Sequence, residues 1–449
     1  MANKATRSRE TLDRLYPAHQ AELVARYESV LANSPYEAVA VYSGAPRYRF
    51  RDDQTWPFRV GAFYQQWVPC DDHAACVLLF RAGRTPLLVL HLPRDYWHSV
   101  PAQPSGAWTA HFDIEIVDDV AAVRGALPED LSGCALVGEP DAAVSDWGCA
   151  AVNPAGIVTQ LEFARLYKTA YEVECVAAAN RCSARGHRAA CEAFLGGAGE
   201  FEIHLAYLEA TAHSEAELPY ANIIALNEHG ATLHYGRFDR VAPANPRSFL
   251  IDAGARCNGY AADVTRTWPA APGGEFAALV QALDRAQQAL VEGLRIGQSY
   301  VDVHEDAQLA VAVILEDFGI VGIAPEDMVT SGVSNVFLPH GVGHHLGLQV
   351  HDTGGKLAGP DGSVLPQPEA WPFLRNLRPV EQGNVFTIEP GIYFIDSLLQ
   401  HLRGTPLGRH VNWDAVERLS PCGGVRIEDN IWMGPGGARN LSREAFDSL

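Results

Sequence analysis

The order of apolar and polar positions divides the chain into a front part with short apolar runs and a rear part with longer helical patterns. Residues 10–31 carry apolar side chains at helical spacing, and Pro17 is expected to interrupt this helix. Short apolar runs follow at residues 75–80, 86–90 and 136–138, with turn residues between them. The front part therefore predicts a mixed α/β domain.

A segment with turn chemistry at residues 152–158 separates the two parts, and we predict domains at residues 1–158 and 159–449. Residues 161–194 then form one long amphipathic helical pattern. Strands are predicted beyond it at 222–226, 248–252 and 263–268, and helices at 275–294 and 301–318. The rear part predicts an α+β fold in which helices cover one side of a largely antiparallel sheet.

Composition indicates a globular protein and excludes several classes. The 449 residues are 47% hydrophobic and 20% charged, so about two or three domains are expected. No apolar run approaches the roughly 20 residues of a membrane helix, and the start lacks a signal-peptide core, so we expect a cytoplasmic protein away from membranes. The nine cysteines form no repeating frame and no C-x-x-C pair, and are expected to stay reduced.

The formal net charge of −20 argues against nucleic acid as a partner, because binding a polyanion requires a basic surface. One interpretation is that the acidic excess only keeps the protein soluble. A second is that some of the acids form a cation site. Their positions along the chain have to decide between the two.

Two acids lie in SFLIDAGARCNGYAADVTRTW, which is typical of a β-hairpin turning near Asn258 and Gly259. If the pairing is centred between Cys257 and Asn258, Asp252 and Asp263 are cross-strand partners about 5 Å apart. Two carboxylates at that distance repel each other unless a cation lies between them. The alternative is that one aspartate faces solvent and the other caps the turn.

The segment FLPHGVGHHLGLQVHD holds His340, His344, His345 and His351 among glycines that disfavour a regular helix. It lacks the glutamate of the HExxH zinc pattern, so that type of site is rejected. The glycines instead let the backbone approach a ligand while the rings project into one cavity. A single histidine is more often a satisfied core residue, but four in one loop favour a site.

Two further acids, Glu389 and Glu428, lie in the apolar runs NVFTIEPGIYF and GGVRIEDNI, at positions patterned for burial. A buried carboxylate without a cation is costly and tends to stay protonated. The acids and one histidine together form an oxygen-rich set that suits two bridged divalent ions better than one tetrahedral zinc. Manganese or cobalt fits this set, and zinc is also accommodated.

In order and spacing, DAG…ADVTRT, HGVGHHLGLQVHD, TIEPGIYF and GGVRIEDN resemble the metallopeptidase family that contains Xaa-Pro dipeptidases, aminopeptidase P and methionine aminopeptidase. The resemblance covers the chain from residue 152 onward, and YRFRDDQTWPF and PRDYWHSV extend it more weakly into the front part. The longer GLQVHD and IEPGIYFIDSLL forms are most similar to bacterial prolidases and organophosphorus acid anhydrolases.

The resemblance implies a pita-bread fold for the rear domain, a smaller α/β domain in front, and two divalent metal ions. The implied ligands are Asp252, Asp263, His344, Glu389 and Glu428. His344 is preferred to His340 because it lies seven residues before His351, as in the family motif. His345 occupies a variable position of the motif and is assigned no role.

The implied reaction is hydrolysis of Xaa-Pro dipeptides by a water that is activated between the two ions. His351 and His340 would donate hydrogen bonds to the oxyanion. Glu389 would move a proton to the leaving nitrogen, and Arg426 would hold the ligand carboxylates in place.

Recognition of proline needs its own residues, because an Xaa-Pro bond has no N–H to grip. The resemblance implies that His234 and Arg375 clasp the proline carboxylate, which favours dipeptides over longer chains. Tyr220 would line the pocket. Related enzymes pair as homodimers, in which Asp53 could reach the neighbouring site and meet the substrate's amino group, although a solvated loop charge is the simpler interpretation of Asp53.

Three other functions stay open. Aminopeptidase P has the same ligands but releases the first residue of longer Xaa-Pro peptides. Hydrolysis of organophosphate esters could accompany dipeptide cleavage, because an activated water attacks phosphorus as well as carbon. A non-catalytic peptide-binding relative would be expected to lose metal ligands, and this chain retains every ligand type.

Overall fold

The computed structural model describes residues 2–97, 99 and 103–449, so His98 and Val100 of PRDYWHSV lie outside it. The described chain divides into two units. The first contains the chain up to Cys175 together with Cys257–Tyr260 and Leu357–Ser363. The second contains Val176–Arg256, Ala261–Lys356 and Val364–Leu449.

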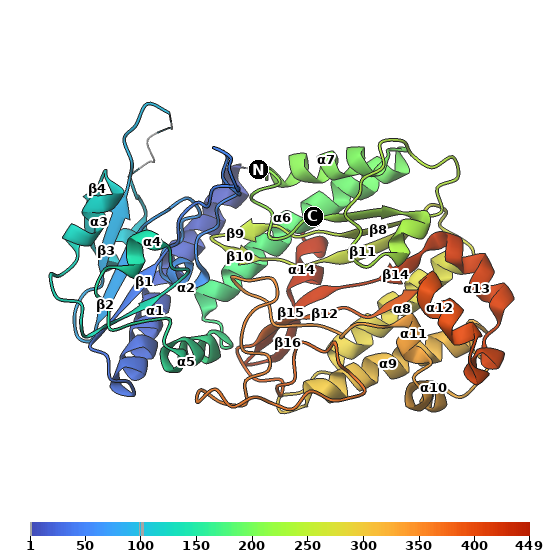
Figure 1. The fold of residues 1–449 in the computed structure, drawn as a ribbon. Coiled ribbons are helices and arrows are strands. Elements are labelled where there is room, and N and C mark those ends of the chain that lie inside the picture. The colour runs from blue at the N-terminus through green and yellow to red at the C-terminus, as the bar shows by residue number, and fades with distance from the viewer. Residues whose placement is uncertain (1, 98, 100–102) are drawn as a thin grey trace. The chain divides into compact units, whose positions relative to one another are not determined.

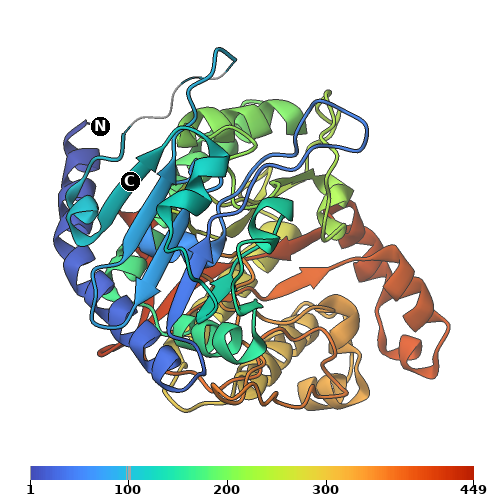
Figure 2. The same cartoon turned by 60° about the vertical axis from the view of Figure 1, so that its left-hand side comes forward.

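A six-stranded mixed sheet organises the first unit, with the strand order β4-β3-β2-β1-β5-β6 (Figures 1 and 2). Its strands are β1 (Ala38–Tyr42), β2 (Val77–Arg81), β3 (Leu87–His91), β4 (Asp113–Val117), β5 (Cys134–Val137) and β6 (Ala151–Val152). The helices are α1 (Ala2–Ala32), α2 (Ala62–Trp67), α3 (Val120–Ala126), α4 (Ala142–Ser145) and α5 (Ala155–Arg165), with a short 3-10 turn η1 (Ala107–His111).

Side chains alternate between the two faces of this sheet along each strand, and both faces are covered. On one face, Leu79 and Leu136 pack in a cluster with Val123 of α3. On the other face, Phe80 of β2 packs edge-on against Tyr27 of α1, with ring centroids 5.4 Å apart. The result is the predicted α/β arrangement.

Two expectations about helices in this unit are wrong. Helix α1 runs through Pro17 without a break, because Tyr16 donates a hydrogen bond to the Trp67 carbonyl at 2.5 Å and the ring of His19 bonds the Gln66 carbonyl at 2.8 Å. These anchors on either side of Pro17 outweigh the one backbone hydrogen bond that proline removes.

The single helix predicted over residues 161–194 is two helices, α5 and α6 (Ala170–Leu195). The break follows from a capping box at Thr169. The Glu172 side chain accepts the Thr169 N–H at 2.8 Å, and the Thr169 hydroxyl accepts the Glu172 N–H at 3.4 Å. This reciprocal pair starts a new helix in the middle of a continuous apolar pattern.

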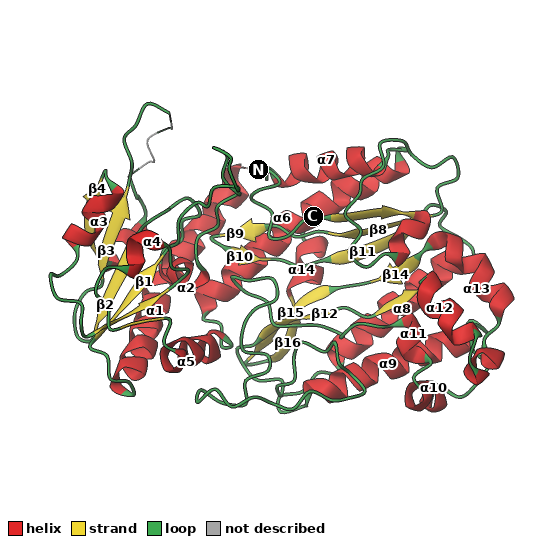
Figure 3. Ribbon diagram, viewed as in Figure 1, coloured by secondary structure: helices red, strands yellow, loops and turns green. Residues whose placement is uncertain are grey.

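The second unit contains antiparallel sheets with the orders β11-β8-β7, β12-β15-β16 and β13-β14 (Figure 3). Its strands are β7 (Ile223–Leu226), β8 (Ser248–Asp252), β11 (Thr265–Pro269), β12 (Val385–Ile388), β13 (Gly391–Tyr393), β14 (Gly424–Arg426), β15 (Asp429–Gly434) and β16 (Gly437–Asn440). A hairpin tip is formed by β9 (Arg256–Cys257) and β10 (Tyr260–Ala261).

Helices from several parts of the chain pack against these sheets. They are α7 (Glu200–Thr211), α8 (Glu275–Glu292), α9 (Tyr300–Asp317), α10 (Pro325–Ser331), α11 (Ser334–Phe337), α12 (Asp396–Arg403), α13 (Trp413–Leu419) and α14 (Leu441–Asp447), with 3-10 turns η2 (Asn227–Ala231), η3 (Pro406–His410) and η4 (Ser420–Cys422). Phe194 and Tyr207 pack on Phe249 of β8, and Val303 packs on Phe386 of β12. The predicted α+β organisation is confirmed.

Two further observations concern the described residues as a whole. None of their helices combines the length and the apolar character that crossing a membrane requires. None of the nine cysteines is joined to another by a disulfide.

Candidate metal centre

The hairpin that carries the two aspartates is paired differently from our prediction. Asp252 lies opposite Thr265, so the predicted pairing of Asp252 with Asp263 is wrong by two residues. The turn is centred between Asn258 and Gly259, which have φ angles of 48° and 84°, as a tight two-residue turn requires. A shift of two residues keeps both acids on one face of the hairpin, because side chains alternate with period two.

Asp252 is held by two donors. The Tyr220 hydroxyl donates to its Oδ1 at 2.7 Å, and the Arg426 guanidinium donates to its Oδ2 at 2.8 Å. The same guanidinium donates through Nε to the Thr265 hydroxyl at 3.1 Å, which in turn donates to Glu428 at 2.7 Å. One buried arginine therefore connects the hairpin acid to the acid between β14 and β15.

The glycine-rich histidine segment is extended and runs beside β12. The Thr387 N–H donates to the His344 carbonyl at 2.9 Å, and the Glu389 N–H donates to the Val342 carbonyl at 2.8 Å. A Cβ on Gly343 would stand 2.0 Å from the Thr387 carbonyl oxygen, so only glycine allows this approach. The pairing brings His344 Nε2 to 3.7 Å from Glu389 Oε1.

Three of the four histidines meet at this place, and the fourth does not. His340 Nδ1 lies 3.7 Å from Glu389 Oε2, and the ring of His351 stands edge-on to that of His344 at 4.4 Å. His345 is buried against Phe386 instead, with ring centroids 6.4 Å apart. The expectation that all four rings share one cavity is wrong for His345, because neighbours in an extended segment point to opposite sides.

The predicted ligands form one buried cluster. Ligand atoms of Asp263, His344 and Glu428 all lie within 4.8 Å of one another. His344 Nε2 is 3.3 Å from Asp263 Oδ2. Glu389 joins the cluster through His344, and Asp252 joins it through Tyr220, whose hydroxyl also interacts with Asp263.

The electrostatics of this cluster call for added positive charge. Burial and the surrounding acids raise the pKa of Glu428 far above its usual value, raise that of Glu389 to about 7, and raise that of Asp252. Burial opposes the charged forms of Asp263 and His344, but their mutual hydrogen bond prevails, so the pKa of Asp263 falls and that of His344 rises. Crowded carboxylates with raised pKa values and one imidazole fit divalent cations.

The predicted substrate-binding residues lie in different places. His234 and Arg375 are exposed, and their charges act on His351, whose pKa falls to about 4 through burial, the neighbouring His344 and these two residues. Tyr220 lies inside the cluster. Asp53 belongs to the first unit, on an exposed loop where the Gln54 side chain donates to it at 3.3 Å.

Two polar residues of the cluster were missed by sequence reasoning. The Tyr393 hydroxyl accepts a hydrogen bond from Arg426 at 3.0 Å and lies 2.8 Å from His340 Nε2. Thr265 connects Arg426 to Glu428. Both residues lie inside the motifs IEPGIYF and ADVTRT. An aromatic residue or a threonine within an apolar run is typical of any buried β-strand, so neither was recognised as part of a site.

A cluster of four acids and one histidine on antiparallel sheets, in a chain with a separate α/β unit, is typical of a metal-dependent hydrolase. Solved structures share this fold. Aminopeptidase P from E. coli with the inhibitor Pro-Leu superposes with a TM-score of 0.71 and 21% identity, covering 95% of each chain. Aminopeptidase PepP from Pseudomonas aeruginosa has a TM-score of 0.71 and 20% identity, again covering 95% of each chain. The predicted pita-bread architecture is confirmed.

Sequence comparison identifies the family of this chain. The model of metallopeptidase family M24 matches residues 174–435, and the model of the Xaa-Pro dipeptidase N-terminal domain matches residues 14–163. The Xaa-Pro dipeptidase of Stenotrophomonas maltophilia (strain K279a) is 44% identical over 96% of this chain and 97% of its own length. That of Pseudoalteromonas translucida is 44% identical over 96% of this chain and 98% of its own length. This chain belongs to metallopeptidase family M24 and carries the N-terminal domain of its Xaa-Pro dipeptidases.

Proposed function

We propose that this chain hydrolyses dipeptides that have proline in second place, and that its metal ligands are Asp252, Asp263, His344, Glu389 and Glu428. The observation that carries the proposal is the meeting of Asp263, His344 and Glu428 within 4.8 Å in a buried cluster, where Arg426 offsets only part of the charge of the acids. Full-length similarity to proteins named Xaa-Pro dipeptidase supports the substrate class.

The five ligands would hold two divalent ions, for which manganese is the best match and cobalt or zinc is also accommodated. Ions bound there supply a water that is activated near neutral pH and a polarised scissile carbonyl. Glu389 would move a proton from that water to the leaving nitrogen.

The hydrogen bonds of His340 favour His351 as the donor to the oxyanion. His340 Nδ1 lies 2.8 Å from the Gly341 carbonyl, which only accepts, so this nitrogen carries the proton. Nε2 then accepts from the Tyr393 hydroxyl at 2.8 Å, and no N–H of His340 remains for substrate. Burial lowers the pKa of His351 to about 4, so its ring is neutral near pH 7 and donates without adding charge.

His234 and Arg375 would bind the proline carboxylate, with Tyr220 at the edge of the pocket. Replacing Arg375 by alanine should raise KM for Ala-Pro by about 10-fold or more and leave metal content unchanged, because a charge-assisted bond is lost. The Arg409→Ala variant, which removes an exposed arginine of η3, serves as the matched control. An unchanged KM would remove Arg375 from the clamp.

The decisive measurement compares Ala-Pro with Ala-Pro-Ala as substrates of the manganese-loaded protein. Higher kcat/KM for Ala-Pro supports a dipeptidase, and higher kcat/KM for Ala-Pro-Ala makes the chain an aminopeptidase P. No hydrolysis of any Xaa-Pro dipeptide by protein with bound metal would support a non-catalytic binding relative. Organophosphate ester hydrolysis is proposed as a side reaction of the same site.

We also propose a cytoplasmic homodimer in which Asp53 meets the amino group of a dipeptide in the partner's site. Nine cysteines without a disulfide support a reducing compartment. Light scattering coupled to size exclusion tests the dimer, and Asp53→Asn should raise KM for dipeptides without changing the mass. A monomer with full activity would overturn this part of the proposal.

A further inference from the structure

One buried carboxylate in the second unit accepts four hydrogen bonds from a single stretch of chain. It belongs to Glu200, the first residue of α7, which is 1% exposed. The donors are the Leu226 N–H at 2.8 Å and His229 Nδ1 at 2.7 Å on Oε1, and the Tyr235 hydroxyl and the Asp239 N–H, each at 2.8 Å, on Oε2. All of them lie in residues 226–239, which we call the His234 segment. One carboxylate therefore fastens both ends of this segment.

His234 lies inside this segment between two anchored neighbours. Leu233 packs against the core cluster that includes strands β13 and β14. Tyr235 is buried in a small cluster with Ile223 of β7 and Leu250 of β8. His234 itself is exposed. Because the chain is held on both sides of His234, the place of its ring follows from the places of its neighbours.

The His234 segment is built in beside the candidate metal centre. Charge on His234 acts on His340 and on His351, which both belong to that centre. The chain just before β14 also approaches the segment closely. A Cβ on Gly423 would lie 2.4 Å from the Asn227 carbonyl oxygen, so only glycine allows this approach. A displaced His234 would therefore be displaced relative to the site.

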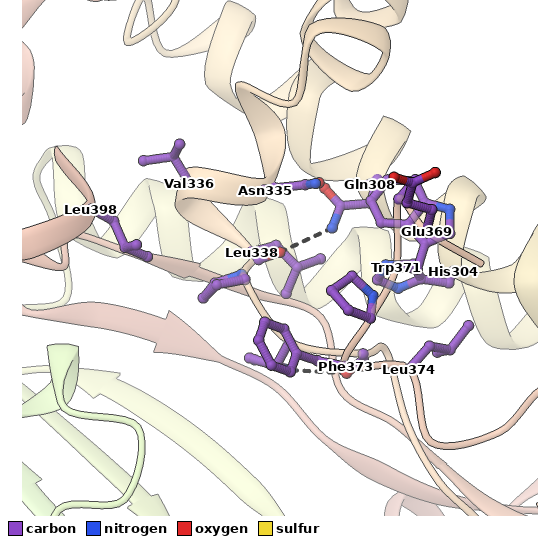
Figure 4. Close-up of a pocket in the computed structure, with 15 residues that line it drawn as sticks. His304, Gln308, Asn335, Val336, Leu338, Glu369, Trp371, Phe373, Leu374 and Leu398 are labelled. Carbon is purple, nitrogen blue, oxygen red and sulfur yellow. Dashed lines mark hydrogen bonds between the residues drawn. The ribbon is translucent and has the colours of Figure 1, made fainter. Parts of the chain in front are cut away.

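The second residue of the proposed clamp, Arg375, follows a less constrained segment. Residues 369–374 directly precede it and form one wall of a cavity of about 390 Å³ (Figure 4). Phe373 in this wall is 71% exposed. Open space beside a segment leaves it fewer neighbours and lets it adjust, whereas a buried carboxylate with four hydrogen bonds does not. The fixed side of the clamp is therefore the side of His234.

We infer that Glu200 is a positioning residue for His234; this inference deepens the proposed function and rests on it. Glu200 does not touch the substrate. It fixes Tyr235 and the ends of the His234 segment, and so determines where the His234 ring meets the proline carboxylate. That carboxylate is bound alike before and during the reaction, so a misplaced His234 changes KM more than kcat.

The surroundings of Glu200 favour a hydrogen-bond centre over a metal site. Glu200, His229 and Asp239 offer atoms within 4.8 Å of one another, as a metal site would. Both oxygens of Glu200 already accept two hydrogen bonds each, which fills the roughly four lone-pair positions of a carboxylate. A cation would have to displace donors that are part of the fold.

Glu200→Gln keeps the shape but cannot satisfy the same four donors. Each oxygen of Glu200 faces one backbone N–H, which only donates, so the amide NH2 of glutamine meets a donor in either orientation. With Ala-Pro we expect KM to rise by about 10-fold, while kcat and metal content change less than about 2-fold. Glu209→Gln, an exposed change on the same helix, is the control and should match the wild type.

Tyr235→Phe is a milder variant that removes only the hydroxyl through which the neighbour of His234 reaches Glu200. It should raise KM for Ala-Pro by about 3-fold, in line with the loss of one hydrogen bond. In the background of His234→Ala, Glu200→Gln should add little, because its effect passes through His234. A thermal unfolding curve for each variant confirms that folded protein is being compared.

Three outcomes would overturn the role of Glu200 while leaving the dipeptidase proposal intact. The first is an unchanged KM in folded Glu200→Gln. The second is additive effects of Glu200→Gln and His234→Ala on KM, which would show that Glu200 acts by another route. The third is one bound ion fewer in Glu200→Gln than in the wild type, which would make Glu200 a metal ligand.

Failure of the dipeptidase proposal has a different signature. A metal-loaded wild-type protein that does not hydrolyse Ala-Pro would overturn that proposal, and with it the role of Glu200. The wild type is therefore assayed first, on the same preparation that provides the metal analysis.

Discussion

Glu428 and Asp429 are neighbours in the chain and both are buried, yet their surroundings are opposite. Asp429 accepts hydrogen bonds from Arg266 at 2.5 Å, from Arg443 at 2.9 Å and from Asn440 at 2.8 Å. Glu428 accepts one hydrogen bond, from the Thr265 hydroxyl, and is surrounded by Asp263, Glu389 and Asp252, whose charges the nearby Arg426 offsets only in part. Adjacent residues at the start of a strand point to opposite sides, so one acid faces a basic cluster and the other faces the metal centre.

The pKa values of the two acids express this difference. Burial and the charges of Asp263, Glu389 and Asp252 raise the pKa of Glu428. Burial also opposes the charge on Asp429, but the two arginines outweigh it and lower its pKa. Asp429 is therefore a completed ion-pair centre that stabilises the fold. Around Glu428 the acids outweigh Arg426, so a cation from outside the chain would complete the charge balance there.

The largest effect expected from this contrast is on turnover. Glu428→Ala and Glu389→Ala should each lower kcat for Ala-Pro by more than about 10³-fold, as for a residue that acts within one catalytic unit. Metal analysis of the purified variants should show at least one ion lost. Full activity in either variant, at any metal concentration, would contradict the ligand assignment.

The next effect is on stability. Asp429→Asn should lower the free energy of unfolding by about 3–5 kcal/mol, because Arg266 and Arg443 both lose a buried carboxylate and only Arg443 keeps another acid, Asp284. Urea unfolding of the metal-free protein measures it. Glu428→Gln under the same conditions should cost nothing or add stability, because a repelled charge is removed. Equal losses in both variants would erase the distinction between the two acids.

A smaller effect is expected from Thr265→Val, which keeps the shape and removes the hydroxyl between Arg426 and Glu428. Metal affinity should fall by about 10- to 100-fold, as for other residues that orient a ligand. Competition with a chelator measures it. Thr330→Val, on an exposed face of α10, is the control and should bind metal like the wild type.

The smallest effect is the pH dependence of the metal-free protein. The folded-state pKa values of Glu428, Asp252 and Glu389 are raised, that of Glu389 to about 7. Raised values favour the folded state below the unfolded pKa of the acids, near 4.5, and this stability is lost as the pH rises to about 7.

The contribution of these acids to the stability of the metal-free protein should therefore fall between about pH 4.5 and 7, by an amount on the order of 2 kcal/mol. Buried histidines with lowered pKa values, such as His304 and His351, act in the opposite direction, so the contribution is taken as the difference in stability between the wild type and Glu428→Gln. Thermal unfolding across this range measures it. Added divalent metal should remove the slope, because a bound cation favours the ionised acids. A difference between the wild type and Glu428→Gln that stays constant with pH over this window would show that the cluster is already compensated.

Sequence reasoning picked out the acids and the histidine of the buried cluster because their residue types stand at fixed spacings within short motifs, and it separated two parts of the chain because periodicity reports local structure. It failed where one local signal overrides another. The hairpin register depends on which residues take the positive φ angles, and the break before α6 depends on a capping box hidden in an apolar pattern.

By itself, the sequence of this M24 protein determined the kinds of side chains that can hold divalent ions and the α+β framework that carries them. Only the tertiary structure decided which of two adjacent acids faces the arginines and that His345 turns away from its neighbours. The physical reason is distance. Burial and charge at each site are set by residues hundreds of positions away, and no local pattern records which of them will meet.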